Sequence, residues 1–196
     1  INIIEEAVLE LKENEFKDLF KSEESLKKLN ESIKKKAEEK STVIENDLNA
    51  LIPKDYIEND TERLNIYRRL YELKTEDELK ILSDELGDRF GEYLEDVKNL
   101  LRMIRIKIKA TRIGIDKLTV RGSELSFYFP EDKENKIFQS MFFTDLLDTI
   151  SKSKSKKYNI APEKEKLIIK INLNSQDDEG RLSEIERILF EDHEVD

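Results

Sequence analysis

The amino-acid sequence predicts an α+β domain in which a small antiparallel sheet packs against several helices, preceded by a helical arm. Apolar residues recur at intervals of three and four through most of the first 112 residues, which is the spacing of amphipathic helices. After Gly114 they alternate with polar residues, which is the spacing of strands. The length of 196 residues suits one domain with an appendage.

The first part of the chain divides into an arm and the start of the domain. Residues 3–40 carry two apolar stripes without Gly or Pro, so we expect a helical arm over 1–41 and a domain over 42–196. Residues 42–52 suggest an extended segment, because the residue before Pro53 avoids the helical conformation.

Three helices are then expected, over about 60–73, 75–90 and 94–112. Thr75 and Glu78 have the spacing of a capping box at the start of the second helix. Gly91 and Gly114 stand where the second and third helices should end.

The remaining residues predict the sheet. Alternating residues 118–120 and 125–129 indicate a hairpin that turns at 121–124. Residues 166–173 alternate as well, so we expect the hairpin plus one or two further strands. Helices are expected over about 135–151, with Met141 facing inward, and after Asp178.

Composition excludes several classes of chemistry. The net charge of −10 does not suit a protein that coats nucleic acid or an anionic membrane with its whole surface. There is no cysteine and only one histidine, His193, so zinc chemistry and histidine-dependent catalysis have almost no ligands or bases. The glycines and serines form no phosphate-binding loop and no GxSxG motif. No apolar run approaches 18 residues. We therefore expect no catalytic residue, no metal and no membrane contact in this chain.

The helix 75–90 carries a candidate docking patch. Its core stripe is centred between Leu82 and Leu86, which leaves Ile81 on the outward side. Ile81 is surrounded by carboxylates, namely Asp77, Glu78, Asp84, Glu85 and Asp88. An exposed apolar residue ringed by acids suits a basic partner. The alternative is a solvated face on which Glu85 and Arg89 form an ordinary i,i+4 pair.

Two basic segments suggest a second hypothesis. Residues 98–112 hold six lysines and arginines and no acid, and residues 151–157 read SKSKSKK. Both could contact phosphates, with Arg102, Arg105, Lys109 and Lys154 as candidates. The alternatives are a buried helix whose basic side chains reach out to neighbouring acids, and a mobile loop. An enzyme that holds Mg²⁺ through converging carboxylates is a third hypothesis.

The sequence also resembles one known family. The resemblance lies in residues 51–57 (LIPKDYI), 63–70 (RLNIYRRL), 85–91 (ELGDRFG) and 97–118, and in the arm at 6–12 (EAVLELK). These segments are similar to the C-terminal domain of the bacterial transcription-repair coupling factors (Mfd). Two departures stand out. Gly87 replaces a usual aliphatic residue, and Glu92, Tyr93 and Leu94 replace the prolines common after the ELxDRFG motif.

The resemblance implies a noncatalytic regulatory domain of a cytoplasmic bacterial protein. The parents are ATP-dependent, helicase-like translocases on double-stranded DNA that displace stalled RNA polymerase and recruit nucleotide excision repair through UvrA. ATP and Mg²⁺ would belong to the upstream motor, and this chain would hold no cofactor. The domain would dock on the N-terminal UvrB-like domain, mask the surface that binds UvrA, and restrain the motor. By the same resemblance, Glu85 and Asp88 would belong to that contact. The alternative function is a DNA-binding accessory module built on residues 98–112 and 151–157.

Overall fold

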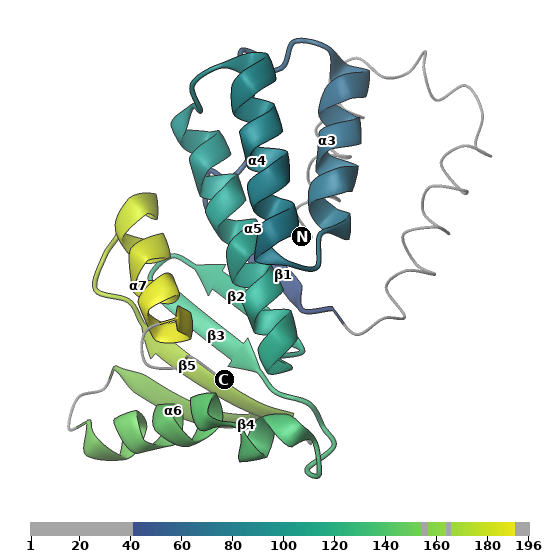
Figure 1. The fold of residues 1–196 in the computed structure, drawn as a ribbon. Coiled ribbons are helices and arrows are strands. Elements are labelled where there is room, and N and C mark those ends of the chain that lie inside the picture. Colours follow the sequence, from purple (N-terminus) through teal and green to yellow (C-terminus); the bar gives the residue numbers. More distant parts are fainter. Residues whose placement is uncertain (1–40, 154–156, 164–165, 191–196) are drawn as a thin grey trace.

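The computed structural model describes residues 41–153, 157–163 and 166–190 (Figure 1). Except for Ser41, the predicted arm over 1–41 lies outside the described residues, as does Lys154. The division at residue 42 therefore stays a prediction.

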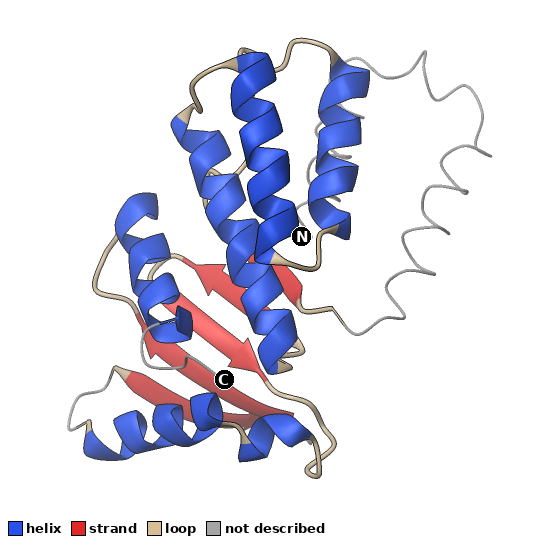
Figure 2. Cartoon of the chain, viewed as in Figure 1, coloured by secondary structure: helices blue, strands red, loops and turns tan. Residues whose placement is uncertain are grey.

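The described residues form an α+β domain, as the sequence predicted (Figure 2). In chain order the elements are β1 (Val43–Asn46), α3 (Asp60–Glu72), α4 (Glu76–Phe90), α5 (Glu95–Ile113), β2 (Lys117–Arg121), β3 (Glu124–Tyr128), the 3-10 helix η1 (Lys136–Gln139), α6 (Met141–Lys152), β4 (Tyr158–Glu163), β5 (Lys166–Asn172) and α7 (Asp178–Phe190).

The strands form one five-stranded sheet in the order β1-β2-β3-β5-β4. The predicted hairpin β2–β3 is confirmed and lies inside the sheet. β1 runs parallel to β2, and the other neighbours are antiparallel. The sheet thus has three strands beyond the hairpin, one more than expected. The additional strand is β4, which has little apolar alternation and contains Pro162, a residue that sheets accept on edge strands.

The core lies on one face of the sheet. Leu118, Phe127 and Ile169 are paired neighbours across three strands and are fully buried, and the Phe127 ring meets Phe142 of α6 at 5.9 Å between centroids. The opposite face carries charged pairs such as Lys117–Glu45 at 2.8 Å. This division into an apolar and a polar face is typical of an antiparallel sheet that is covered on one side.

The helix boundaries follow their caps. The capping box of Thr75 and Glu78 is present at the start of α4. Gly91 and Gly114 end α4 and α5 with φ angles of 83° and 99°, which favour glycine.

The expected helix over 135–151 is in fact two helices that meet at Ser140. Ser140 accepts a hydrogen bond from the Phe143 N–H and so caps a new helix, α6. The restart changes which residues face the core: Phe143 is buried, whereas Met141 is 58% exposed. The prediction that Met141 faces inward was wrong.

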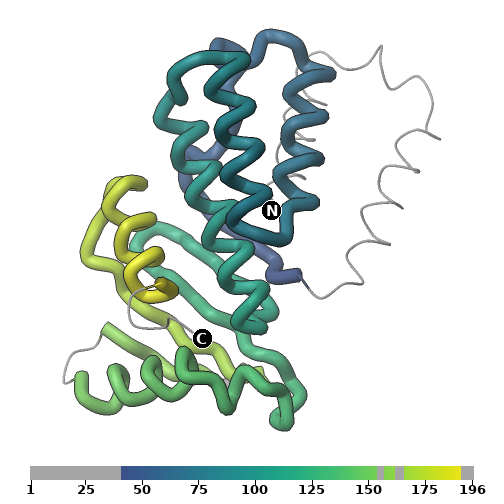
Figure 3. Tube along the Cα trace, viewed as in Figure 1, coloured from purple at the N-terminus to yellow at the C-terminus, as the bar shows by residue number. Residues whose placement is uncertain are grey.

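Helices α3, α4 and α5 stand side by side above the sheet, and α7 lies along the lower half of α5 (Figure 3). Helix α4 contacts both neighbours, because Glu85 pairs with Arg69 of α3 and Glu76 pairs with Arg105 of α5. This arrangement leaves one long face of α4 toward solvent.

Candidate docking surface

The outward face of α4 is where the sequence placed the docking patch. Leu79, Leu82 and Leu86 are 7% exposed or less and fix the orientation of the helix. Ile81 is 68% exposed, the highest value for a large apolar residue in the described part of the chain. The 3.6-residue period therefore predicted the outward side correctly.

The acids around Ile81 differ in how far they are already engaged. Glu78 accepts hydrogen bonds from the N–H groups of Lys74 at 2.8 Å and Thr75 at 3.1 Å, which lower its pKa. Asp84 pairs with Lys80 at 2.7 Å, but both side chains are more than 60% exposed. Asp77 and Asp88 are exposed and form no hydrogen bond or ion pair with another described residue. Asp88 is therefore open to an outside partner.

Glu85 is engaged within the domain. Its two carboxylate oxygens accept a bidentate pair of hydrogen bonds from Arg69 of α3, one of them at 2.7 Å. Arg89, one turn further along α4, donates a third at 3.0 Å and also pairs with Glu62 of α3. The hydrogen bond from Arg69 is the main cause that lowers the pKa of Glu85 to about 2. Glu85 thus braces α3 against α4, although its side chain is still 32% exposed.

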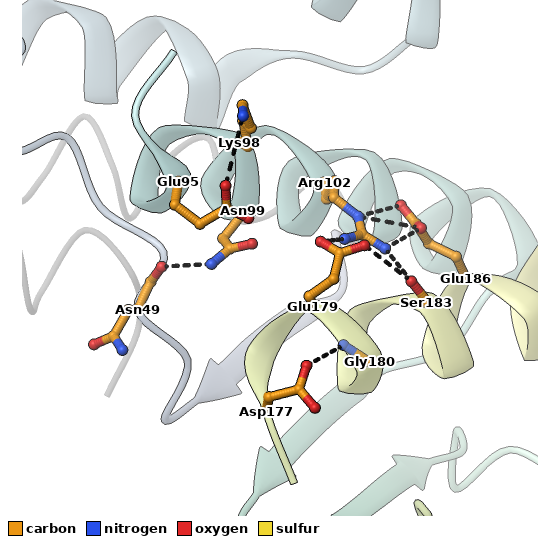
Figure 4. Close-up of polar contacts among 10 residues, drawn as sticks. All are labelled: Asn49, Glu95, Lys98, Asn99, Arg102, Asp177, Glu179, Gly180, Ser183 and Glu186. Carbon is orange, nitrogen blue, oxygen red and sulfur yellow. Dashed lines mark hydrogen bonds and ion pairs between the residues drawn. The ribbon is translucent and has the colours of Figure 1, made fainter. Parts of the chain in front are cut away.

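The candidate phosphate-binding residues of α5 meet acids of other helices. Arg102 donates to Glu186 at 2.7 Å, to Glu179 at 2.7 Å and to Ser183 at 2.9 Å, all on α7 (Figure 4). The contacts with Glu186, the main cause, and with Glu179 raise the pKa of Arg102. Its side chain is only 21% exposed.

Arg105 and Lys109 lie further along the same face of α5. Arg105 pairs with Glu76 of α4 at 2.7 Å, and its guanidinium lies 4.2 Å from the centre of the Phe190 ring. The Lys109 ammonium lies 5.4 Å from the same ring. The structure thus brings Arg102, Arg105 and Lys109 together, beside α7. This is the arrangement that the alternative reading of a basic helix paired with nearby acids predicts.

Sequence reasoning missed a buried lysine on the same helix. Lys107 is 7% exposed, its ammonium donates to the Tyr71 carbonyl at 3.0 Å, and it lies 3.9 Å from the Tyr71 ring centre. Burial lowers the pKa of Lys107 to about 8. The sequence does not predict that Lys107 is buried. Other basic residues surround it in the chain, and its neighbours Ile106 and Ile108 do not distinguish it from them.

The described residues contain neither a candidate membrane span nor a candidate metal cluster. No helix in that part of the chain is long and apolar enough to cross a membrane. Nor does any group of three His, Cys, Asp or Glu side chains there have the placement to hold a metal ion.

The fold and the sequence of the helical region match one family. Residues 46–140 match the TRCF domain model. The matched segment is slightly less than half of the chain. The match includes the whole of α3, α4 and α5, and therefore the exposed face around Ile81.

Two known proteins with similar sequences are named transcription-repair-coupling factors. A transcription-repair-coupling factor of Staphylococcus haemolyticus is 37% identical over 82 residues, which is 42% of this chain and 7% of the relative. One of Helicobacter pylori is 34% identical over 119 residues, 60% of this chain and 12% of the relative. The matched regions thus span about a tenth of these relatives.

A solved structure supports the fold. The crystal structure of a C-terminal domain of transcription-repair coupling factor superposes with a TM-score of 0.61, covering 76% of this chain and 89% of that one at 19% identity. The predicted resemblance to such a C-terminal domain is therefore confirmed in sequence over the helical region and in fold over most of the chain.

Proposed function

We propose that this chain is a noncatalytic, autoinhibitory interaction domain of a transcription-repair coupling factor. The TRCF domain would dock through α4 on the N-terminal UvrB-like domain of the same parent protein. Docking would mask the surface that binds UvrA and would restrain an ATP-dependent translocase on double-stranded DNA. The parent would displace stalled RNA polymerase and recruit nucleotide excision repair once the contact opens.

The exposure of Ile81 carries this proposal. Three buried leucines already fix the orientation of α4. Packing within the domain therefore does not account for an isoleucine with 68% of its surface in water. Single exposed apolar residues are common, but this one lies one turn before Asp84 and two turns before Asp88, just ahead of the segment 85–91 that resembles the docking motif of the family. An apolar centre with a polar rim is the usual anatomy of a protein interface.

The contacts of Glu85 refine the roles of the two motif acids. A carboxylate has about four acceptor positions, and three of those on Glu85 are used by Arg69 and Arg89. Asp88 has all of its positions open toward solvent. We therefore assign the direct, charge-assisted contact with an arginine of the partner to Asp88, and to Glu85 mainly the task of holding α3 and α4 together.

Such a contact makes a weak clamp, which suits a switch. Partly solvated ion pairs contribute up to about 1 kcal/mol each, so the closed state would be favoured by only a few kcal/mol. If UvrA binds only the open state, its apparent affinity is reduced by the open fraction. Weakening the clamp should raise the affinity for UvrA until all molecules are open.

The test uses the full-length parent protein with Ile81→Ser and Asp88→Lys together. We expect UvrA to bind about tenfold more tightly, because losing 1.4 kcal/mol of docking opens the clamp tenfold. Glu134→Lys is the matched control, since it makes the same charge change at an exposed loop position before η1. Unchanged UvrA affinity in the double variant, with the melting temperature preserved, would refute the proposal.

The DNA-binding alternative has less support. It needs the cations of α5, yet Arg102 and Arg105 already pair with Glu186, Glu179 and Glu76. Phosphate binding would have to displace these acids. Duplex affinity that falls steeply with salt would restore the alternative.

A further inference from the structure

A contact between Tyr93 and Gly87 alters the docking helix where this chain departs from its family. A Cβ atom added at Gly87 would lie 3.2 Å from the Tyr93 hydroxyl oxygen and 3.6 Å from the ring carbon that bears it. The first distance is tighter than an ordinary contact. Gly87 therefore leaves a notch in the side of α4, and the hydroxyl end of Tyr93 occupies it.

The Tyr93 hydroxyl also binds the backbone of α4. It donates a hydrogen bond to the carbonyl oxygen of Ser83, one turn before Gly87. Because Tyr93 follows the end of α4 by three residues, this bond folds the connection between α4 and α5 back onto the docking helix. The Tyr93 ring also meets the Tyr56 ring edge-on, at 6.3 Å between centroids.

Tyr56 holds the same connection from the buried side. Its hydroxyl shares its single hydrogen between the carbonyl oxygens of Leu86 at 3.2 Å and Gly91 at 3.3 Å. Tyr56 is 8% exposed, whereas Tyr93 is half-buried. The two tyrosines thus differ in one respect that matters for docking, since only Tyr93 can reach a partner.

Two acids of the proposed docking surface lie close to the Tyr93 hydroxyl. Burial is the main cause that raises the pKa of Tyr93, and the negative charges of Asp84 and Asp88 raise it further. A hydrogen bond with the Gly87 backbone acts in the opposite direction. The phenol thus stays protonated at neutral pH and lies on the flank of α4 that carries Asp84 and Asp88.

We infer that Tyr93 is the aromatic anchor of the docking surface on α4, and that Gly87 is present to seat it. This inference rests on the proposed function and deepens it. The occupant is the UvrB-like domain of the parent, which would pack on the exposed part of the Tyr93 side chain, on the flank of α4 next to Asp84 and Asp88. Tyrosine is enriched among the residues that dominate interface energies, where it lies inside a polar rim. In this chain Gly87 stands where the family pattern has an aliphatic residue, and Tyr93 stands in the segment where it has prolines.

A double-mutant cycle in the full-length parent tests the seating of Tyr93, with UvrA affinity as the measure of opening. Gly87→Ala alone forces the hydroxyl to move, and we expect docking to weaken about threefold, equivalent to about 0.65 kcal/mol. In the Tyr93→Phe background the nearest ring atom is 3.6 Å away, so Gly87→Ala should have no further effect. A role of Gly87 confined to helix propensity would give the same change in both backgrounds, and that result would overturn the inference.

Removing the ring tests the anchor itself. We expect Tyr93→Ser to weaken docking at least tenfold, as interface anchors typically do. Tyr56→Phe is the matched control, because it removes hydroxyl bonds to the same connection from a buried position. It should lower the melting temperature and change docking less than twofold. Equal opening by Tyr56→Phe and Tyr93→Ser would reduce Tyr93 to a structural support and would overturn the inference.

The outcomes separate the inference from the function on which it rests. If Ile81→Ser with Asp88→Lys opens the parent but Tyr93→Ser does not, the docking function stands and the anchor is wrong. If neither variant opens the parent, the docking function and the anchor role of Tyr93 are both wrong. The Gly87→Ala cycle keeps the test decisive should Tyr93→Ser prevent folding, because it retains an aromatic ring in every variant.

Discussion

Helices α4 and α5 are both densely charged in sequence, but the structure uses their charges in opposite ways. The basic face of α5 is joined to acids of α4 and α7, and Arg102 alone contacts three residues of α7. The acids around Ile81 include Asp77 and Asp88, which have no such partner among the described residues. A charge run shows what a helix can bind, and its neighbours in the fold decide what remains available.

The two helices also differ in how much each ion pair contributes. Arg102 and Glu186 are each 21% exposed, so water screens their attraction only partly. Lys80 and Asp84 on α4 are 74% and 63% exposed, and pairs of this kind contribute little. The Arg102–Glu186 pair of α5 therefore stabilises the fold, whereas the Lys80–Asp84 pair on the outward face of α4 contributes almost nothing to it.

Arg102→Ala should have the largest effect on stability. It leaves Glu186 and Glu179 beside α5 without their cation and removes several hydrogen bonds, at a cost of about 2–3 kcal/mol. Urea unfolding of the chain measures this loss. Lys80→Ala on α4 is the control and should change the free energy of unfolding by less than about 0.5 kcal/mol. Equal losses in the two variants would remove the contrast between the helices.

Lys107→Met should stabilise the protein by about 1–2 kcal/mol at pH 7, less than the full cost of the lowered pKa because a hydrogen bond to Tyr71 is lost. The folded-state pKa of about 8 lies below the ordinary value of 10.5, so the unfolded chain binds the proton more tightly. The resulting destabilisation is fully present below pH 8 and is relieved as the pH rises toward 10.5.

The difference between Lys107→Met and wild type should therefore shrink between pH 8 and pH 10.5, as measured by thermal unfolding. Lys98→Met, at an exposed position of the same helix, should show no such dependence. A wild-type protein more stable than Lys107→Met at pH 7 would show that the contacts with Tyr71 outweigh the cost of burial.

Glu85→Gln should have the smallest of the three effects, a loss of about 1 kcal/mol at pH 7 once its partial exposure is taken into account. The pKa of Glu85 is lowered to about 2, so its contribution is present above pH 4.5 and is lost as the pH falls toward 2. Unfolding at pH 7 and pH 2.5 measures the difference. Asp88→Asn should leave the free energy of unfolding unchanged at both pH values. A loss of stability similar to that of Glu85→Gln would mean that Asp88 is engaged within the fold.

The elements that the sequence predicted are those with local determinants. Thr75 and Glu78 are three residues apart and meet at the start of α4, and Gly114 ends α5 through its own backbone conformation. The outward position of Ile81 follows from the helical period alone. Each of these depends on interactions within one or two turns of chain.

The features that were missed depend on distant partners or on weak patterns. Arg102 meets Glu186 across 84 residues, and Arg69 meets Glu85 across 16, so no spacing rule connects them. Strand β4 depends on its pairing with β5 more than on its own composition. Ser140 is a capping residue that the sequence does contain, but the apolar pattern continues on both sides of it and hides the break.

The order of the strands has a practical consequence for anyone who trims this protein. A fragment cut to residues 46–140 would keep β2 and β3 but lose nearly all of β1 on one side and all of β5 on the other. Both edges of the remaining hairpin would then have unpaired backbone N–H and C=O groups, and part of its apolar face would be exposed. Such a fragment should aggregate, whereas one that begins before Val43 and continues through Phe190 keeps the sheet intact.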